Sequence, residues 1–377
     1  MKKLLIIFIL LLILSNINDL ETANETRGVF ISYIELSEYI KDYSEETSKN
    51  NIKKMINNIK GYNLNTIILQ VRVSSDAIYD SNIFPYSKYI TNDGKSYDVL
   101  DYFIKEAHNS NLRLYAWINP YRVETTNNID LITKDNPAYK YIGTDNIYIN
   151  NGIYYNPAKK EVVNLIVDGV EEVLNYNIDG LLFDDYFYQN TNIDYNDYKK
   201  YLIKHPNISL EEYRLNNVNN LVKTVYSKCK EKNIKFGISP DGNIDNNYQK
   251  NMADIRSWMS EDNYIDFIIP QLYYGFNNEA KSYPKAIAEW QKLIRNDDLE
   301  MLIGLAAYKI GKEDIYAKGG RKEWIENNNI LMKEVILARN INNYKGFVIF
   351  RYDNLFNKDT FTNNNTIEIS NLKKVIK

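Results

Sequence analysis

Short apolar runs alternate with segments of helical periodicity from residue 28 onward, and this alternation constrains the fold more than any other feature. The apolar runs cover residues 28–33, 66–73, 112–120, 180–188, 234–240, 266–274, 301–308 and 346–353. Between them, apolar residues recur at helical spacing, as in Ile52, Met55, Ile56 and Ile59. Eight strands, each followed by a helical segment, predict an α/β fold in which a parallel sheet closes into a (β/α)8 TIM barrel.

The long connections of this predicted barrel all follow the ends of strands. They cover residues 76–98, 121–160 and 189–210, and loops of this length usually have a function or lack fixed structure. Because they follow strand ends, we expect them to wall a groove over the carboxyl face of the barrel. No linker or shift in composition interrupts the chain, so residues 24–377 are expected to form one domain, with a polar tail after Leu355 lying against the barrel.

The first 23 residues have the features of a targeting segment. Lys2 and Lys3 precede an apolar stretch, residues 4–14, that is shorter than the roughly 20 residues needed to span a bilayer. This pattern predicts a secretory signal peptide, or an uncleaved anchor because Thr22 and Ala23 make a poor cleavage site. The expected location is extracellular or at the cell envelope of a bacterium, with this segment as the only membrane contact. Cys229 is the only cysteine, so no disulfide framework is expected.

The fourth apolar run ends in two adjacent carboxylates, Asp184 and Asp185. Carboxylates at the carboxyl end of a buried barrel strand are often catalytic, although an aspartate there can also simply cap the next helix. Other strand ends supply polar and aromatic residues that would meet at the same face. These candidate substrate-binding residues are Arg72, Asn119, Tyr121, Tyr186, Asp241, Gln271, Tyr273, Tyr274, Tyr308 and Asp353. A polar pocket rimmed by aromatic rings indicates a carbohydrate site, although Arg72 alone also fits a buried ion-pair partner.

The composition argues against other chemistries. A net charge of −3 gives no basic surface for nucleic acid. His108 and His205 are the only histidines. Two are too few for a three-histidine zinc site, and neither is placed for Ser/His/Asp catalysis. We therefore expect no metal and no cofactor. Carboxylates remain, and hydrolysis of a glycosidic bond requires little else.

The second carboxylate of such a mechanism is not obvious, because the sixth and seventh strands end in Gln271 and Tyr308. Either Asp241 or Asp353 is the partner, or a 2-acetamido group of the substrate acts as the nucleophile. In the second case we assign Asp185 as the general acid and Asp184 as the carboxylate that orients the acetamido group. The reverse assignment remains open, because neighbouring side chains on a strand point in opposite directions.

Eight motifs occur in order along residues 27–355 and resemble those of the glycosyl-hydrolase-like family ten, bacterial envelope proteins with a (β/α)8 barrel. They are 27–32 (RGVFIS), 70–72 (QVR), 87–89 (SKY), 116–123 (AWINPYRV), 183–188 (FDDYFY), 237–240 (GISP), 270–273 (PQLY) and 306–308 (AAY). The resemblance implies a glycoside hydrolase that acts on cell-wall glycan, with the family's acidic pair at Asp184 and Asp185. The chain departs from the family pattern at Val73, Asp241, Tyr274 and Gln189, and the change at Tyr274 could alter which sugar stacks there.

Two alternatives stand beside this hypothesis. The first is a non-catalytic glycan-binding barrel at the cell surface, which would have no need of a paired acid. The second is an enzyme of another class on the same barrel, since a fold alone does not fix function. No feature of the sequence specifies an oligomeric state.

Overall fold

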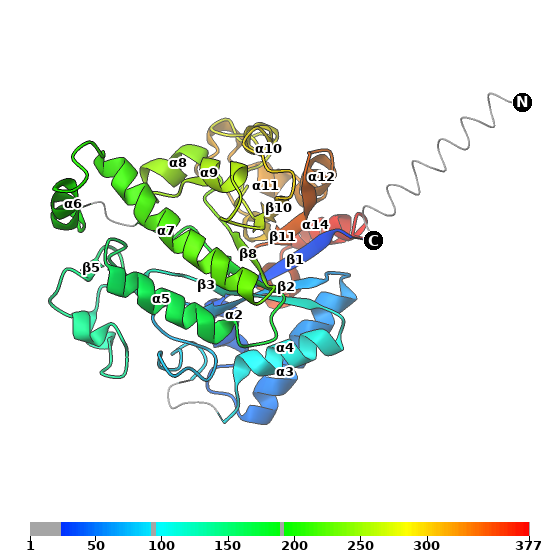
Figure 1. Cartoon of the computed structure of the whole chain (residues 1–377). Helices are drawn as coiled ribbons and strands as arrows, with labels where there is room; N and C mark the ends of the chain where they lie inside the picture. Colours follow the sequence, from blue (N-terminus) through cyan, green and yellow to red (C-terminus); the bar gives the residue numbers. More distant parts are fainter. Residues whose placement is uncertain (1–23, 92–95, 189–191, 377) are drawn as a thin grey trace, which may run out of the picture.

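A computed structural model describes residues 24–91, 96–188 and 192–376. Within these residues, eight parallel strands close into a barrel, as the sequence predicts (Figure 1). In chain order the barrel strands are β1 (Thr26–Ile31), β2 (Thr66–Arg72), β3 (Arg113–Ile118), β7 (Gly180–Phe183), β8 (Lys235–Ile238), β9 (Phe267–Ile268), β10 (Glu300–Leu305) and β11 (Tyr344–Ile349). Their spatial order is β1-β11-β10-β9-β8-β7-β3-β2, and β1 closes the ring by pairing with both β2 and β11.

Alternate residues of each strand point into the barrel or out toward the helices. On β2, Ile68 lies in the barrel interior, while Ile67 and Leu69 pack in the outer layer between strands and helices. The interior cluster is formed by Phe30, Ile68, Tyr115, Trp117, Leu182, Phe267, Ile269, Leu302 and Val348. The apolar runs of the sequence are longer than the strands, because each run continues into the loop at the carboxyl end. The run 180–188, for example, leaves the sheet after Phe183.

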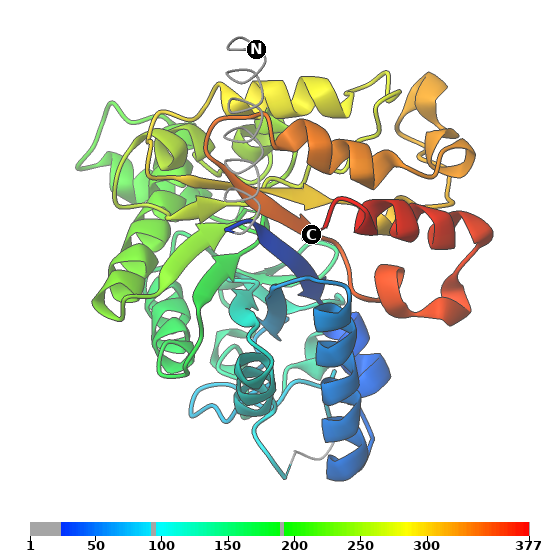
Figure 2. The same ribbon diagram turned by 90° about the vertical axis from the view of Figure 1, so that its right-hand side faces the viewer.

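Helices surround the barrel and cover its outer face (Figure 2). They are α2 (Tyr33–Tyr39), α3 (Glu45–Gly61), α4 (Val99–Asn109), α5 (Lys160–Val173), α6 (Tyr195–Leu202), α7 (Leu210–Glu231), α8 (Ile244–Gln249), α9 (Ile255–Ser260), α10 (Tyr283–Gln291), α11 (Glu323–Glu326), α12 (Ile330–Ala338), α13 (Asp353–Phe356) and α14 (Asn363–Lys373). The predicted apolar stripe of α3 is fully buried, and the Ser44 side chain caps its first turn by accepting from the N–H of Thr47. No described helix is long and apolar enough to cross a membrane.

The connection 121–160 contains a small antiparallel sheet that the sequence analysis did not predict. Its strands are β4 (Arg122–Glu124), β5 (Ile147–Ile149) and β6 (Ile153–Tyr155), in the order β4-β6-β5. Since β4 follows β3 closely, this sheet stands beside the carboxyl ends of β3 and β7. The polar tail ends in α14, which packs against α12 and α13. The predicted targeting segment, residues 1–23, lies outside the described residues, as does Gln189.

Candidate active site

Asp184 directly follows β7 and is held firmly at the mouth of the barrel. Its side chain is 4% exposed and accepts a 3.1 Å hydrogen bond from Trp117 Nε1, on β3. The same carboxylate oxygen, Oδ2, accepts a hydrogen bond from Asn119 Nδ2. The other oxygen is 3.4 Å from the backbone N–H of Tyr186, which points toward it. These donors fix the orientation of the carboxylate before any ligand arrives.

A chain of amide groups extends this support from the end of β3 to β2 and to the start of α2. Asn119 Oδ1 accepts from Gln70 Nε2 and, at 3.0 Å, from Arg122 Nη2. Gln70 Oε1 in turn accepts the backbone N–H of Tyr33 at 3.0 Å. Asn119 therefore lies at the site as predicted, although it is fully buried and acts through Asp184 rather than on a ligand.

Gln70, Trp117 and Arg122 were not among the predicted site residues. The alternation of side chains along a strand could have found the first two. Gln70 is two residues beyond the interior residue Ile68, and Trp117 is two residues beyond Tyr115. Polar atoms on inward-facing positions near the end of a barrel strand must point toward the mouth. Arg122 gives no such signal, because it lies in β4 of the small sheet.

Asp185 is held more loosely than its neighbour. It is half-buried, and Gln271 Nε2 donates to Oδ1 over 3.3 Å while also donating to the backbone oxygen of Ser239 over 3.0 Å. A partly exposed carboxyl with one long side-chain hydrogen bond can turn toward a bound substrate. The structure therefore distinguishes an anchored carboxylate, Asp184, from a more accessible one, Asp185.

The pKa values of both carboxyl groups lie above the ordinary range of aspartate. Burial raises the pKa of Asp184, and the negative charge of Asp185 raises it further. Burial also raises the pKa of Asp185, with a second contribution from the charge of Asp241. The positive charge of Arg122 opposes both shifts. Two adjacent carboxyl groups with raised pKa values can hold one proton between them near neutral pH, as an acid and base pair requires.

Aromatic side chains surround the pair. The rings of Tyr273 and Tyr308 meet edge to face at 5.6 Å, and Phe350 lies 5.9 Å and 6.0 Å from them. The Arg122 guanidinium lies 5.2 Å from the ring of Tyr186. Burial makes the largest contribution to the raised pKa of Tyr273, and the Tyr308 hydroxyl and the charge of Asp185 raise it further. Tyr273 is therefore a neutral hydrogen-bond donor close to the acidic pair.

Asp241 and Tyr274 also lie beside the acidic pair, and their substrate-binding roles stay predictions. Both are half-buried, and the charge of Asp241 contributes, after burial, to the raised pKa of Tyr274. The carboxylate of Asp241 is occupied by its own loop: Oδ1 accepts the N–H of Asn243 at 2.7 Å and Oδ2 accepts Asn246 Nδ2 at 2.9 Å. The predicted residues Tyr186, Gln271, Tyr273 and Tyr308 join Asp241 and Tyr274 around the pair.

Arg72 and Tyr121 do not line the mouth, which corrects their predicted role. Arg72 is 1% exposed, stacks on Phe84 with its guanidinium carbon 3.8 Å from the ring centre, and points toward α5. A Cβ added to Gly169 of α5 would lie 2.5 Å from Arg72 Nη1. Tyr121 has no exposed surface and packs against Phe187 in the outer core. Neither side chain can touch a ligand at the mouth in this conformation.

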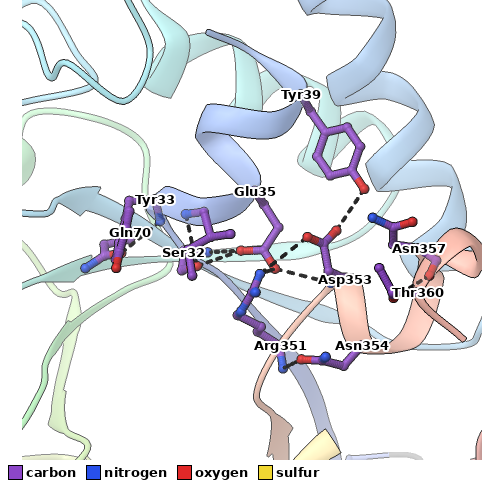
Figure 3. A network of polar contacts seen from close by, with 11 residues as sticks. Ser32, Tyr33, Glu35, Tyr39, Gln70, Arg351, Asp353, Asn354, Asn357 and Thr360 are labelled. Carbon is purple, nitrogen blue, oxygen red and sulfur yellow. Dashed lines mark hydrogen bonds and ion pairs between the residues drawn. The ribbon is translucent and has the colours of Figure 1, made fainter. Parts of the chain in front are cut away.

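Asp353 belongs to a separate polar network at the ends of β1 and β11 (Figure 3). Its Oδ1 accepts the hydroxyl of Tyr39 at 2.8 Å, and its Oδ2 lies 3.4 Å from Arg351 Nη1. Arg351 also forms an ion pair with the fully buried Glu35, which accepts from the N–H and hydroxyl of Ser32. These bonds engage both oxygens of Asp353 in joining α2 to the segment after β11, and no described contact links it to Asp184 or Asp185.

Among the described residues, no group of three or more His, Cys, Asp and Glu side chains is arranged to hold a metal ion. His108 pairs with Asp179 at 2.9 Å, and His205 stacks on Tyr201 with ring centres 4.1 Å apart. Both histidines therefore have structural partners away from the acidic pair.

A closed parallel barrel with an acidic pair and aromatic rings at its mouth is the architecture of the glycoside-hydrolase barrels. Two solved structures share the barrel fold: the glycoside hydrolase domain of PgaB (BpsB) from Bordetella bronchiseptica, and the endo-1,4-beta-mannanase from Rhizomucor miehei. The first has a TM-score of 0.54 at 13% identity, covering 86% of this chain and 93% of that one. The second has a TM-score of 0.54 at 12% identity, covering 93% of this chain and 94% of the mannanase chain. At these identities the likeness concerns the fold alone.

Within this class, the chain belongs to the glycosyl hydrolase-like 10 family, whose sequence model matches residues 25–321. This confirms the resemblance noted in the sequence. Glycosyl hydrolase YngK of Bacillus subtilis is 35% identical over 298 residues, which cover 72% of this chain and 58% of YngK. Glycosyl hydrolase DigH of Escherichia coli is 28% identical over 334 residues, covering 80% of this chain and 74% of DigH. The chain thus matches less than two thirds of the length of YngK.

Proposed function

We propose that this protein is an exported glycoside hydrolase that cleaves glycosidic bonds in 2-acetamido-sugar glycans of the peptidoglycan type. The observation that carries the proposal is the acidic pair at the carboxyl end of β7, with one member anchored and the other accessible. Asp185 is the general acid that protonates the leaving oxygen. Asp184, fixed by Trp117 and Asn119, is the carboxylate that orients the acetamido group.

The surroundings of the other carboxylates favour the substrate's own acetamido oxygen as the nucleophile. Asp241 has both oxygens bound by its own loop, and Asp353 is engaged by Tyr39 and Arg351. Neither is presented as a free nucleophile opposite Asp185. Attack by the acetamido carbonyl oxygen on the anomeric carbon requires no second protein nucleophile, only a carboxylate that holds the acetamido N–H.

The substrate class is supported by the aromatic rim and by the family. The half-buried rings of Tyr273, Tyr274 and Tyr308 can stack on sugar faces beside the acidic pair. Relatives named as glycosyl hydrolases, and the targeting pattern of residues 1–23, favour an extracellular polysaccharide as substrate.

Incubation of the purified protein with defined peptidoglycan glycan strands tests the proposal, with strands that carry stem peptides and strands that lack them. We expect mass spectrometry to show products cut at a glycosidic bond, and Asp185→Asn to yield few of them. Glycans that bind but are never cut by the wild-type protein would instead identify a glycan-binding barrel and end the proposal of catalysis.

A further inference from the structure

A second aromatic cluster lies at the mouth of the barrel, away from the acidic pair. The rings of Tyr33 and Tyr89 contact each other with centres 4.6 Å apart and an interplanar angle of 48°. Both are half-buried, so part of each ring faces solvent. Tyr33 begins α2, two residues beyond the end of β1, and Tyr89 comes from the connection between β2 and α4, so the pair stands on the carboxyl face with the acidic pair.

The ring of Tyr89 is fixed in place by its neighbours. Its hydroxyl lies 3.0 Å from Thr125 Oγ1, and the ammonium of Lys88 is 5.4 Å from the ring centre. Lys88 itself forms a 2.6 Å ion pair with Glu124, the last residue of β4. These bonds join two of the long connections, 76–98 and 121–160, so a preformed aromatic surface stands where both loops meet.

The position of this surface relative to the acidic pair suggests its use. Around the barrel, β1 is separated from β7 by β2 and β3, while β9, which precedes Tyr273, is separated from β7 by β8 on the other side. Along this side of the ring, from β9 through β7 to β1, the acidic pair therefore lies between Tyr273 and the second cluster. The backbone N–H of Tyr33 also donates to Gln70, which begins the amide chain to Asp184, so the second cluster and the acid share one rigid support.

We propose that Tyr33 and Tyr89 form a distal subsite that stacks on a sugar residue of an extended glycan whose scissile bond lies at Asp184 and Asp185. The proposal rests on the proposed function and deepens it: the protein acts on long chains and binds them across the carboxyl face of the barrel on both sides of the cleaved bond. Lys88, whose side chain is 41% exposed, can donate hydrogen bonds to hydroxyl groups at the edge of the stacked ring.

Chito-oligosaccharides of increasing length, from the disaccharide to the hexasaccharide, test this subsite by calorimetry in an Asp185→Asn background that slows cleavage. We expect affinity to rise with length, and Tyr89→Ala to abolish the gain for the longest chains, a loss of about tenfold or about 1.4 kcal/mol. The shortest ligands should bind equally to both proteins. Tyr89→Phe, which keeps the ring and loses only the bond to Thr125, should bind nearly as the parent does.

Tyr226→Ala is a matched control, because Tyr226 lies on α7, is also half-buried and has Lys230 5.5 Å from its ring centre. This variant should leave the dependence of affinity on oligosaccharide length unchanged. If Tyr89→Ala binds long chains as tightly as its parent, or if the parent shows no gain with length, the distal subsite is wrong even where hydrolysis is observed. If the wild-type protein cuts no glycan but Tyr89→Ala still loses the gain, the catalytic proposal fails and the subsite stands.

Discussion

Asp184 loses its proton less readily than an ordinary aspartate in the free protein, and the acetamido N–H that it holds in the proposed mechanism favours its charged form. Burial and the neighbouring Asp185 raise the pKa of Asp184 in the folded protein above its value in the unfolded chain. The folded state therefore binds this proton more tightly, and ionisation of Asp184 destabilises the fold. The penalty is fully present above the raised folded pKa, and it disappears as the pH falls below the ordinary value of an aspartate.

Asp184→Asn should consequently stabilise the protein at pH 8 while it impairs activity. We expect a gain of about 1 kcal/mol or more in the free energy of unfolding, because the raised pKa of Asp184 makes its ionisation cost the folded state free energy. The gain should shrink toward zero on acidification. Urea unfolding at several pH values measures it, and a variant that loses stability equally at all pH values would show that the hydrogen bonds from Trp117 and Asn119 outweigh the charge.

Arg122 is the residue that counters these shifts. Its positive charge lowers the pKa of both Asp184 and Asp185, and its guanidinium also donates to Asn119. Arg122→Gln should therefore raise both pKa values and move the pH–rate profile of hydrolysis toward higher pH. Arg122→Lys keeps a positive charge and should leave the profile near that of the wild type. A profile of Arg122→Gln that does not move, or moves toward acid, would contradict this role.

At the residue scale, the sequence predicted which side chains stand at strand ends better than it predicted where they point. Arg72 was placed at the mouth because it ends β2, but the pairing of β2 with β3 shifts register between Gln70 and Arg72. The irregularity turns Arg72 outward against α5 and leaves Gln70 as the inward polar residue. Tyr121 follows the same strand end as Asn119, yet it packs outward on Phe187.

At the scale of elements, the contact between α12 and α14 contains buried carboxyl groups. Glu334 of α12 has no exposed surface, and neither of its oxygens has a hydrogen-bond partner among the described residues. Burial raises the pKa of Glu334 well above the ordinary value, and the charges of Glu368 and Glu323 add to the shift. Glu368, on α14, accepts the N–H of Leu331 at 2.7 Å. The C-terminal helix therefore packs against a carboxyl group whose burial favours the protonated form.

Glu334→Gln should strengthen this contact at neutral and alkaline pH. Because the folded pKa of Glu334 is raised, its ionisation destabilises the fold at high pH, and the amide removes that penalty. We expect the variant to unfold at a higher temperature at pH 8 and to differ little from the wild type at pH 4. Glu326→Gln, at an exposed position on α11, is the matched control and should change neither value. Equal unfolding temperatures for Glu334→Gln and wild type at pH 8 would contradict the account.

The strands and major helices could be predicted because each follows a local rule. Buried parallel strands are continuous apolar runs, and helices such as α3 and α5 carry an apolar stripe with helical spacing. The small sheet of β4, β5 and β6 follows no such rule. Its strands have three residues each, and β4 is tied to the loop after β2 by hydrogen bonds from Ser75 N–H to Val123 O and from Arg122 Nε to Val73 O. Their sequence therefore carries little periodic signal.

At the scale of the whole molecule, the first 23 residues predict export, since a basic start and a short apolar stretch are typical of secretory signals. Fractionation of cells that produce the full chain tests this. We expect the protein outside the cytosol, either released without residues 1–23 or held in the membrane fraction with Met1 intact. Full-length protein found soluble in the cytosol would overturn the proposed location and weaken the case for a cell-wall substrate.

The barrel gathers residues from across the sequence at one face, where we propose that Asp184 and Asp185 carry out substrate-assisted hydrolysis. Rates on aryl glycosides of N-acetylglucosamine or N-acetylmuramic acid test it most directly. Asp185→Asn should lose about 10²–10⁴ in rate and recover in part with better leaving groups, which need no proton. Asp184→Asn should slow all these substrates alike. Full activity on sugars that lack the 2-acetamido group would contradict the claim, and the missing nucleophile would then have to be sought at Asp241.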